Sequence, residues 1–338
     1  AYEGGLDPAE TIFVDTDAPG ANDGSSWTDA FIDLQGALAV ATDNDEIWIA
    51  EGTYTPGTDQ GDSFTVVGGK DGLGIFGGFA SGETDRSQRD PSANPVVLSG
   101  DIGAAGDNSD NSFHVLFFDG TGSGTITTAT VLDGVTVTGG NANGPGSDDD
   151  GGGLFCDGSG SGNECSPTLG NIIFTDNSAS RDGGAIYNDG TGSGASNPAI
   201  TNAAFTGNSA GDEGGAIYND GNGGTSSPQL TNATFTGNSA STSGGAVFND
   251  GSISGASDPT IANTILFGND ASNGHEIGIR NATATLSRTL VEGGVGGPGV
   301  GGAVTDDGGN LDADPLFSNV VDPDGPDDTF GTDDDGLR

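Results

Sequence analysis

Short apolar runs separated by Gly, Asn and Pro dominate the chain, and over residues 151–290 they recur at a fixed period. The heptapeptide GGAIYND stands at 183–189 and 214–220, and GGAVFND follows at 244–250, at intervals of 31 and 30 residues. The apolar runs are three to six residues long and rich in Ile, Val, Phe, Tyr and Thr. Such runs are too short for helices and are typical of strands. Three strands per repeat predict one coil of a parallel β-helix, in which each strand pairs with its equivalent in the next coil.

In such a solenoid, equivalent side chains of successive coils lie about 4.8 Å apart and form columns. Because like shapes pack well on one another, we expect the apolar columns to build the core. Three columns are expected: Ile186, Ile217 and Val247; Ile200, Leu230 and Ile261; and Phe174, Phe205, Phe235 and Leu266.

Asparagine recurs in the same way. The three series are Asn171, Asn202, Asn232 and Asn263; Asn177, Asn208, Asn238 and Asn269; and Asn188, Asn219 and Asn249. A stacked amide can donate to one neighbour and accept from the other, so these columns can satisfy themselves in the interior. Of the two Asn-x-Thr sequons, at Asn232 and Asn281, we therefore expect only Asn281 to be open to glycosylation.

An aspartate series, Asp157, Asp189, Asp220 and Asp250, precedes a glycine in each repeat. Buried carboxylates at this spacing would repel one another. We therefore expect these residues where the chain leaves the coil into variable loops, either splayed apart or sharing a cation. The alternative is that they are exposed turn residues without an ion.

The repeats are flanked by different patterns. Residues 1–60 predict a strand and a capping helix in "SSWTDAFIDLQGALAVA", with Ser26 as its N-cap and Trp27, Phe31, Leu34, Leu38 and Ala41 on one face. Residues 61–290 are assigned to β-helix coils, and residues 291–338 to an acidic, loop-rich segment. The predicted fold class is all-β, a parallel β-helix with a short N-terminal capping helix.

Charge and cysteine content limit the functions open to this fold. The chain carries 50 Asp and Glu against 7 Lys and Arg, a formal net charge of −43. Such acidity excludes ordinary nucleic-acid binding and docking on anionic membranes, since both require basic side chains. Cys156 and Cys165 lie nine residues apart and could close a small disulfide ring or remain free thiols.

Two motifs carry a family resemblance. The segment "DLQGALAVATDNDEIWIAEGTY" resembles the opening of pectate-lyase-like right-handed β-helix proteins. The paired "GGAIYND" and "FTGNSA" are similar to the GGA[ILV] and FxxN repeats of chlamydial polymorphic outer membrane proteins and related bacterial surface proteins. The resemblance implies a right-handed solenoid at the cell surface or outside the cell, in a group that contains both lyases and adhesins.

We therefore expect a non-enzymatic surface or matrix module for adhesion or filament formation, with no catalytic residues and no membrane insertion. Its partners would be a second copy stacked head to tail, an extracellular glycan or a host surface. The alternative is a polysaccharide lyase or glycoside hydrolase. The resemblance implies that a lyase of this fold would use a Lys or Arg base beside calcium, and the candidates are Lys70, Arg86, Arg89, Arg181, Arg280 and Arg288. Arg86 and Arg89 are predicted instead to be paired charges in a surface loop, and the acidic stretch 147–150 to be a solvated loop.

The acidic tail resembles oxygen-rich calcium loops, although it lacks the twelve-residue EF-hand pattern. The ligands of a calcium site in this segment would come from Asp322, Asp324, Asp327, Asp328, Asp333 and Asp335.

Overall fold

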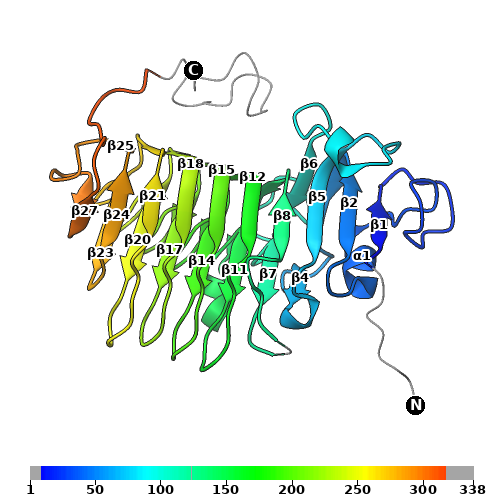
Figure 1. Cartoon of the computed structure of the whole chain (residues 1–338), viewed down its shortest axis with the longest axis horizontal. Coiled ribbons are helices and arrows are strands. Elements are labelled where there is room, and N and C mark those ends of the chain that lie inside the picture. The colour runs from blue at the N-terminus through cyan, green and yellow to red at the C-terminus, as the bar shows by residue number, and fades with distance from the viewer. Residues whose placement is uncertain (1–8, 123, 317–338) are drawn as a thin grey trace.

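Parallel pairing of equivalent strands builds the molecule from one end to the other (Figure 1). The computed structural model describes residues 9–122 and 124–316 of the 338. Its strands form three sheets of 15, eight and four strands, wound around a common core. The prediction of an all-β, right-handed parallel β-helix is confirmed.

The 15-stranded sheet follows the order β1-β2-β5-β8-β12-β15-β18-β21-β24-β27, with β3, β6, β9, β22 and β25 beside this path. Its strands are β1 Thr11–Val14, β2 Glu46–Ala50, β3 Gly52–Tyr54, β5 Gly74–Phe79, β6 Val96–Ser99, β8 Val131–Asp133, β9 Thr136–Thr138, β12 Thr168–Thr175, β15 Ala199–Thr206, β18 Gln229–Thr236, β21 Thr260–Ala262, β22 Ile265–Leu266, β24 Ala284–Ser287, β25 Leu290–Val291 and β27 Val304–Asp306. The eight-stranded sheet contains β4 Phe64–Val67, β7 Leu116–Asp119, β11 Leu154–Asp157, β14 Ile186–Asp189, β17 Ile217–Asp220, β20 Val247–Asp250, β23 Ile277–Arg280 and β26 Val300–Gly301. The four-stranded sheet contains β10 Asn141–Ala142, β13 Ser178–Ala179, β16 Ser209–Ala210 and β19 Ser239–Ala240.

The three apolar columns are formed as predicted. The strand register pairs Ile186 with Ile217 and Ile217 with Val247, and aligns the other two series in the same way. The rings of Phe174, Phe205 and Phe235 are fully buried and stack with centroids 5.3 and 4.5 Å apart. Each coil therefore completes the core of the coil before it.

Two of the three asparagine columns are buried, as predicted. Asn177, Asn208, Asn238 and Asn269 are at most 6 % exposed, and each Nδ2 donates to the Oδ1 of the next at 3.1, 2.9 and 2.8 Å. The series ends on Glu276, whose Oε2 accepts from Asn269 Nδ2 at 2.6 Å. A parallel ladder joins Asn188 to Asn219 and Asn219 to Asn249, each at 2.8 Å.

The third asparagine column lies on the outside, so the prediction of an interior position was wrong. Asn171, Asn202, Asn232 and Asn263 are exposed and have left-handed φ angles of 46°, 52°, 55° and 50°. Each residue turns the chain between two halves of a long outer strand, and the turn points its side chain to solvent. Asn232 is therefore exposed, as Asn281 is, and the prediction that only Asn281 is open to glycosylation loses its basis.

The N-terminal helix is shorter than predicted. Helix α1 spans Leu34–Val40, and its N-cap is Asp33, whose side chain accepts from Gly36 N at 2.7 Å. Ser26 instead bonds Asp29 within the preceding loop. Trp27 lies outside the helix and packs edge-on against Phe13, with ring centroids 4.7 Å apart.

The parallel ladder continues through both of the expected domain boundaries. Strands β1 and β2, before residue 60, belong to the same sheet as β5, and β27, after residue 290, pairs with β24. In the part of the chain that the structure describes, three 3-10 helices interrupt the coils, at Gly68–Lys70, Arg86–Gln88 and Gly146–Asp149. The second of these forms one wall of the site described next.

Candidate functional site

A groove of about 660 Å³ lies on the outer face of the 15-stranded sheet and crosses β9, β12, β15 and β18. One side is formed by the exposed asparagines of three successive coils, Asn171, Asn202 and Asn232. The opposite wall is the segment 86–96, which contains the 3-10 helix Arg86–Gln88. The regular repeats thus meet an irregular loop from an earlier coil at this place.

The asparagine side of the groove is a hydrogen-bonded ladder with unused capacity. Asn232 Nδ2 donates to Asn202 Oδ1 at 3.2 Å, Asn202 Nδ2 to Asn171 Oδ1 at 3.1 Å, and Asn171 Nδ2 to Asp133 Oδ2 at 2.9 Å. An amide has two N–H donors and two lone pairs. Since each ladder contact uses one donor and one lone pair, each coil keeps a donor and an acceptor for a ligand.

The loop wall carries two arginines that are held by carboxylates. Arg86 Nη1 donates to Glu46 Oε1 at 2.7 Å, and Arg89 pairs with Asp133. Both guanidinium groups also lie over the ring of Phe76, at 4.3 and 5.4 Å from its centroid. The predicted paired charges are present, but these residues border a groove, which the sequence did not indicate.

The floor between the two walls is apolar. Ile173, Ala204 and Thr234 are in register on β12, β15 and β18 and line this floor. Small alanine side chains in the central coil leave the space that larger neighbours would fill. The groove therefore presents an apolar strip with hydrogen-bonding groups along its edge.

The eight-stranded sheet carries a second, more enclosed cluster on the face away from the core. Phe155, Tyr187, Tyr218 and Phe248 stack there with successive centroids 5.2, 5.2 and 5.3 Å apart and are only 3–4 % exposed. Tyr187 Oη donates to Asp220 at 2.9 Å, and Tyr218 Oη to Asp250 at 3.4 Å.

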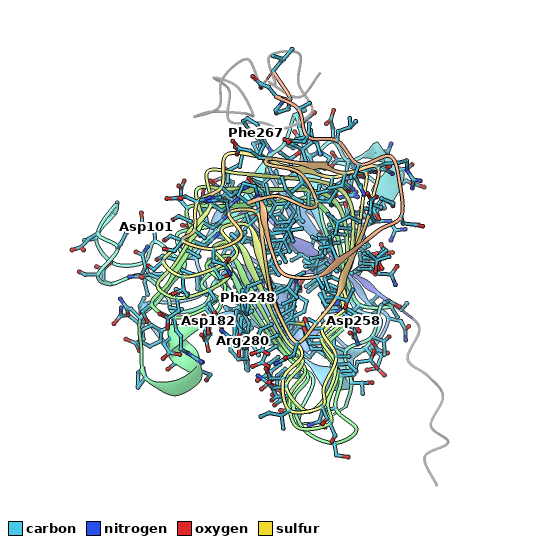
Figure 2. All side chains as sticks on the ribbon, turned by 90° about the vertical axis from the view of Figure 1, so that its left-hand side faces the viewer. Asp101, Asp182, Phe248, Asp258, Phe267 and Arg280 are labelled. Atoms are coloured by element: carbon cyan, nitrogen blue, oxygen red, sulfur yellow. A yellow bond between two sulfur atoms is a disulfide. The ribbon has the colours of Figure 1, made fainter. Side chains whose placement is uncertain are left out.

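A column of carboxylates borders this aromatic stack. Asp150 accepts from the backbone N–H of Asp182, and Asp182 from that of Glu213, each at 3.0 Å. Arg181 pairs with Asp150, and Arg280 pairs with Glu213 while lying 4.9 Å from the ring of Phe248. Figure 2 shows Asp182, Phe248 and Arg280 on the same flank of the solenoid. The prediction of a solvated loop at 147–150 was wrong for Asp150, which is 1 % exposed.

Burial governs the protonation of this cluster. It raises the pKa of Asp150 to about 8 and that of Asp182 to about 7, although the charge of Arg181 opposes both shifts. Burial likewise raises the pKa of Glu213, against the charge of Arg280. Within residues 9–122 and 124–316, no group of three or more His, Cys, Asp or Glu side chains has an arrangement suited to a metal ion.

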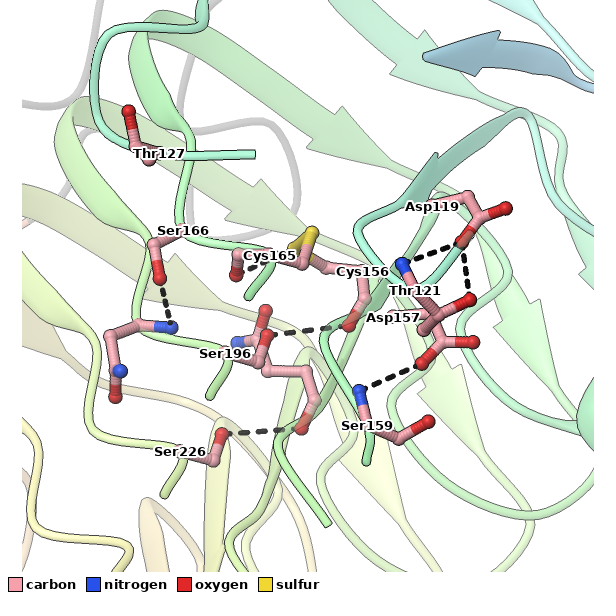
Figure 3. Close-up of a disulfide and its surroundings, with 12 residues drawn as sticks. Asp119, Thr121, Thr127, Cys156, Asp157, Ser159, Cys165, Ser166, Ser196 and Ser226 are labelled. Carbon is pink, nitrogen blue, oxygen red and sulfur yellow. Dashed lines mark hydrogen bonds between the residues drawn. A yellow bond between two sulfur atoms is a disulfide. The ribbon is translucent and has the colours of Figure 1, made fainter. Parts of the chain in front are cut away.

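The aspartate series marks the entry to the loops, as predicted, but it is not exposed. Asp157 and Asp189 are half-buried, and Asp220 and Asp250 are buried. Each accepts from the backbone N–H two residues later, as in the Asp157 and Ser159 pair of Figure 3. The carboxylates are thus used to close turns at the points where the chain enters the loops.

Cys156 and Cys165 form a buried disulfide at the start of the polar ladders (Figure 3). In the following coils their places are taken by Asn188 and Ser196, Asn219 and Ser226, and Asn249 and Ser257. Ser196 Oγ donates to Cys156 O at 3.3 Å, and Ser226 and Ser257 repeat this bond in later coils. Because the disulfide has no donor, Asn188 Oδ1, which faces it, has no partner among the described residues.

This arrangement predicts how the disulfide can be replaced. We expect the double substitution Cys156→Asn with Cys165→Ser to be more stable than Cys156→Ala with Cys165→Ala by about 1–2 kcal/mol, because the new amide can donate to Asn188 Oδ1. Urea unfolding of the two double variants, compared with the oxidised parent, measures the difference. Equal stability would show that the ladder does not continue into this coil.

Other sequence candidates are separate from the groove. All six proposed calcium ligands, Asp322 to Asp335, lie outside the described residues, so the calcium site stays a prediction. Lys70 Nζ donates to the carbonyl oxygen of Leu38, and burial lowers its pKa. The groove itself was missed. Its only sequence signal was a third asparagine column, identical in spacing to the two buried ones.

Comparison with known proteins supports the resemblance to chlamydial membrane protein repeats and the resemblance to pectate-lyase-like β-helices. Residues 171–189, 202–220 and 232–250 match the family model described as Chlamydia polymorphic membrane protein (Chlamydia_PMP) repeat. Among solved structures, the crystal structure of pectate lyase Pel9A superposes with a TM-score of 0.54 at 17 % sequence identity. The match covers 85 % of this chain and 64 % of that chain, and at this identity it establishes the fold alone. No curated protein matches the sequence.

Over the three matched segments the chain is a repeat protein similar to this membrane protein family. Among the described residues, no helix is both long and apolar enough to cross a membrane.

Proposed function

We propose that this chain is a non-enzymatic, extracellular surface module that uses its solenoid as a rigid support and its lateral groove for adhesion. The observation that carries this proposal is the position of the groove. Its asparagine edge is made by Asn171, Asn202 and Asn232, which belong to the three repeats that match the polymorphic membrane protein model. The repeat thus supplies both the stacking interactions and the ligand-facing amides.

Cleavage of a glycan is the second candidate, because the fold is shared with a pectate lyase. A lyase requires a base with a free lone pair close to the substrate, and Arg86 and Arg89 are instead held in ion pairs with carboxylates. Lys70 is hydrogen bonded to helix α1. These contacts favour binding over cleavage in the groove.

Filling the groove tests the proposal. Ala204 lies on its floor, and the neighbouring coils carry the larger Ile173 and Thr234 at the same position, so Ala204→Tyr should fold. Beads coated with the chain are applied to surfaces bearing cell-wall polysaccharides or matrix proteins. We expect attachment to at least one surface, with an at least fivefold loss for Ala204→Tyr and no loss for Ala199→Tyr, which is on the same strand outside the groove.

The same preparations are incubated with polysaccharides, and unsaturated products and new reducing ends are measured. Product formation that Ala204→Tyr abolishes would overturn the proposal in favour of the enzymatic alternative. Sedimentation of the free chain measures self-association. Filaments unaffected by Ala204→Tyr, without any attachment to the surfaces, would point to assembly as the function and would also overturn it.

A further inference from the structure

We propose that the groove binds an extended, uncharged glycan, an inference that rests on the proposed adhesive use of this site. The ligand would lie across β12, β15 and β18, along the amides of Asn171, Asn202 and Asn232. Pectate, the polymer in the name of the similar lyase structure, is a polyanion. The charge of this chain and of its groove favours an uncharged polymer instead.

The groove offers no net positive charge to an anionic polymer. Its two cations, Arg86 and Arg89, are each paired with a carboxylate, Glu46 and Asp133. Asp90 lines the same wall and is exposed. The chain as a whole has a formal net charge of −43, which repels any polyanion before contact. An uncharged polymer needs no free positive charge in the groove and is not repelled by the negative charge of the chain.

The hydrogen-bonding groups suit hydroxyls, which both donate and accept. Each exposed asparagine keeps one N–H and one lone pair after the ladder bonds are made. Thr136 adds a hydroxyl on another side of the groove, and Ser87 and Ser92, which donate to Asp85 and Asp90, add acceptor lone pairs. Because the pattern repeats at the strand spacing of about 4.8 Å, successive units of one linear polymer can be held in the same way.

The floor suits the remaining surface of a sugar ring. Ile173 and Ala204, with the methyl group of Thr234 in register beside them, form an apolar strip between the polar edges. Pyranose rings combine hydroxyls at the rim with C–H groups on their faces, so a ring lying on this strip buries its apolar face while its rim contacts the amides. An extended peptide would instead pair with an exposed sheet edge, whereas this groove lies on a sheet face.

Calorimetric titration with defined oligosaccharides tests the inference. The probes are neutral hexasaccharides of glucose, xylose, mannose and N-acetylglucosamine, with hexagalacturonate as the charged counterpart. We expect at least one neutral probe to bind at least tenfold more tightly than hexagalacturonate, with an affinity that changes less than twofold between 0.05 and 1 M NaCl, because screening has no charge on the ligand to act on.

Two matched variants locate the binding. Asn202→Ala should weaken binding of the neutral probe about five- to tenfold. Asn281→Ala should leave it unchanged, because Asn281 is exposed with a similar φ of 51° but lies outside the groove. Equal melting temperatures of the two variants exclude a folding defect, and Ala204→Tyr provides an independent block of the same groove.

The outcomes separate this inference from the proposed function. Tighter, salt-dependent binding of hexagalacturonate, or equal loss in both asparagine variants, overturns the inference. If beads attach through the groove to a protein-coated surface and no neutral probe binds, the glycan is wrong and the adhesive role stands. If neither beads nor probes depend on Ala204, both are wrong.

Discussion

Replacing Asn208 by alanine is expected to lower the free energy of unfolding by about 3–5 kcal/mol, because several buried polar groups lose their partner at once. Asn208 is fully buried in the middle of the interior ladder. Its Nδ2 donates to Asn238 Oδ1 and to Phe174 O, each at 2.9 Å, and its Oδ1 accepts from the backbone N–H and Nδ2 of Asn177, each at 3.1 Å.

Each orphaned group in the interior costs about 1–3 kcal/mol, and the costs are not additive because neighbouring groups relax together. The space left by an amide is also small, so a water molecule can restore only part of the lost bonding. Urea unfolding followed by circular dichroism measures the loss. The transition should also broaden, since a solenoid depends on contacts between adjacent coils to unfold as one unit.

Asn202→Ala is the matched control, because it removes an asparagine ladder residue from the same coil on the exposed face. Its partners, Asn171 and Asn232, can turn to water. We expect a loss of about 1 kcal/mol or less, part of it from placing alanine at the left-handed φ of 52°. Similar losses for the two variants would show that burial of the amide is not what makes the interior ladder stabilising.

The contrast between these two asparagines also marks the limit of the sequence argument. The repeat period predicted that both series would be in register, and pairing of β12, β15 and β18 confirms it. The period does not state which face a column occupies. That depends on local backbone turns, and Asn202 has a positive φ whereas its neighbours continue the strand.

The candidate groove was beyond prediction for a related reason. One edge is made by repeats, but the other is the segment 86–96, which belongs to a coil without a recognisable period. Arg86 and Asn202 are separated by more than a hundred residues, and only the stacking of coils brings them to the same hollow.

The acidic cluster on the eight-stranded sheet predicts an unusual dependence of stability on pH. Burial raises the pKa of Asp182 to about 7, well above the ordinary 3.8 of an aspartate side chain. Between these two pH values the folded state keeps a proton that the unfolded state has released, so the contribution of this group to stability falls as pH rises. Below pH 4 the unfavourable contribution is absent, and above pH 7 it is fully present.

Asp182→Asn should remove the part of the pH dependence of stability that comes from the Asp182 carboxyl group. The amide oxygen can still accept from the backbone N–H of Glu213, the bond that Asp182 makes at 3.0 Å. Because one pKa unit corresponds to about 1.4 kcal/mol, the variant should gain about 2–4 kcal/mol relative to the parent between pH 4 and pH 8. The substitution also removes the ion pair between Arg181 and Asp182, whose charged atoms lie 3.7 Å apart, but Arg181 retains Asp149 and Asp150 as partners, which limits this loss.

The difference between variant and parent is the quantity to measure, because many exposed carboxylates also titrate below pH 5. Urea midpoints at half-unit steps from pH 4 to pH 9 give this difference directly. Asp212→Asn is the control. It removes the same charge as Asp182→Asn, but Asp212 is exposed, so its carboxylate is not desolvated in the folded state. A difference for Asp182→Asn that stays constant with pH, or that the control reproduces, would show that Asp182 is ionised in the folded protein and that the cluster carries its full negative charge at neutral pH.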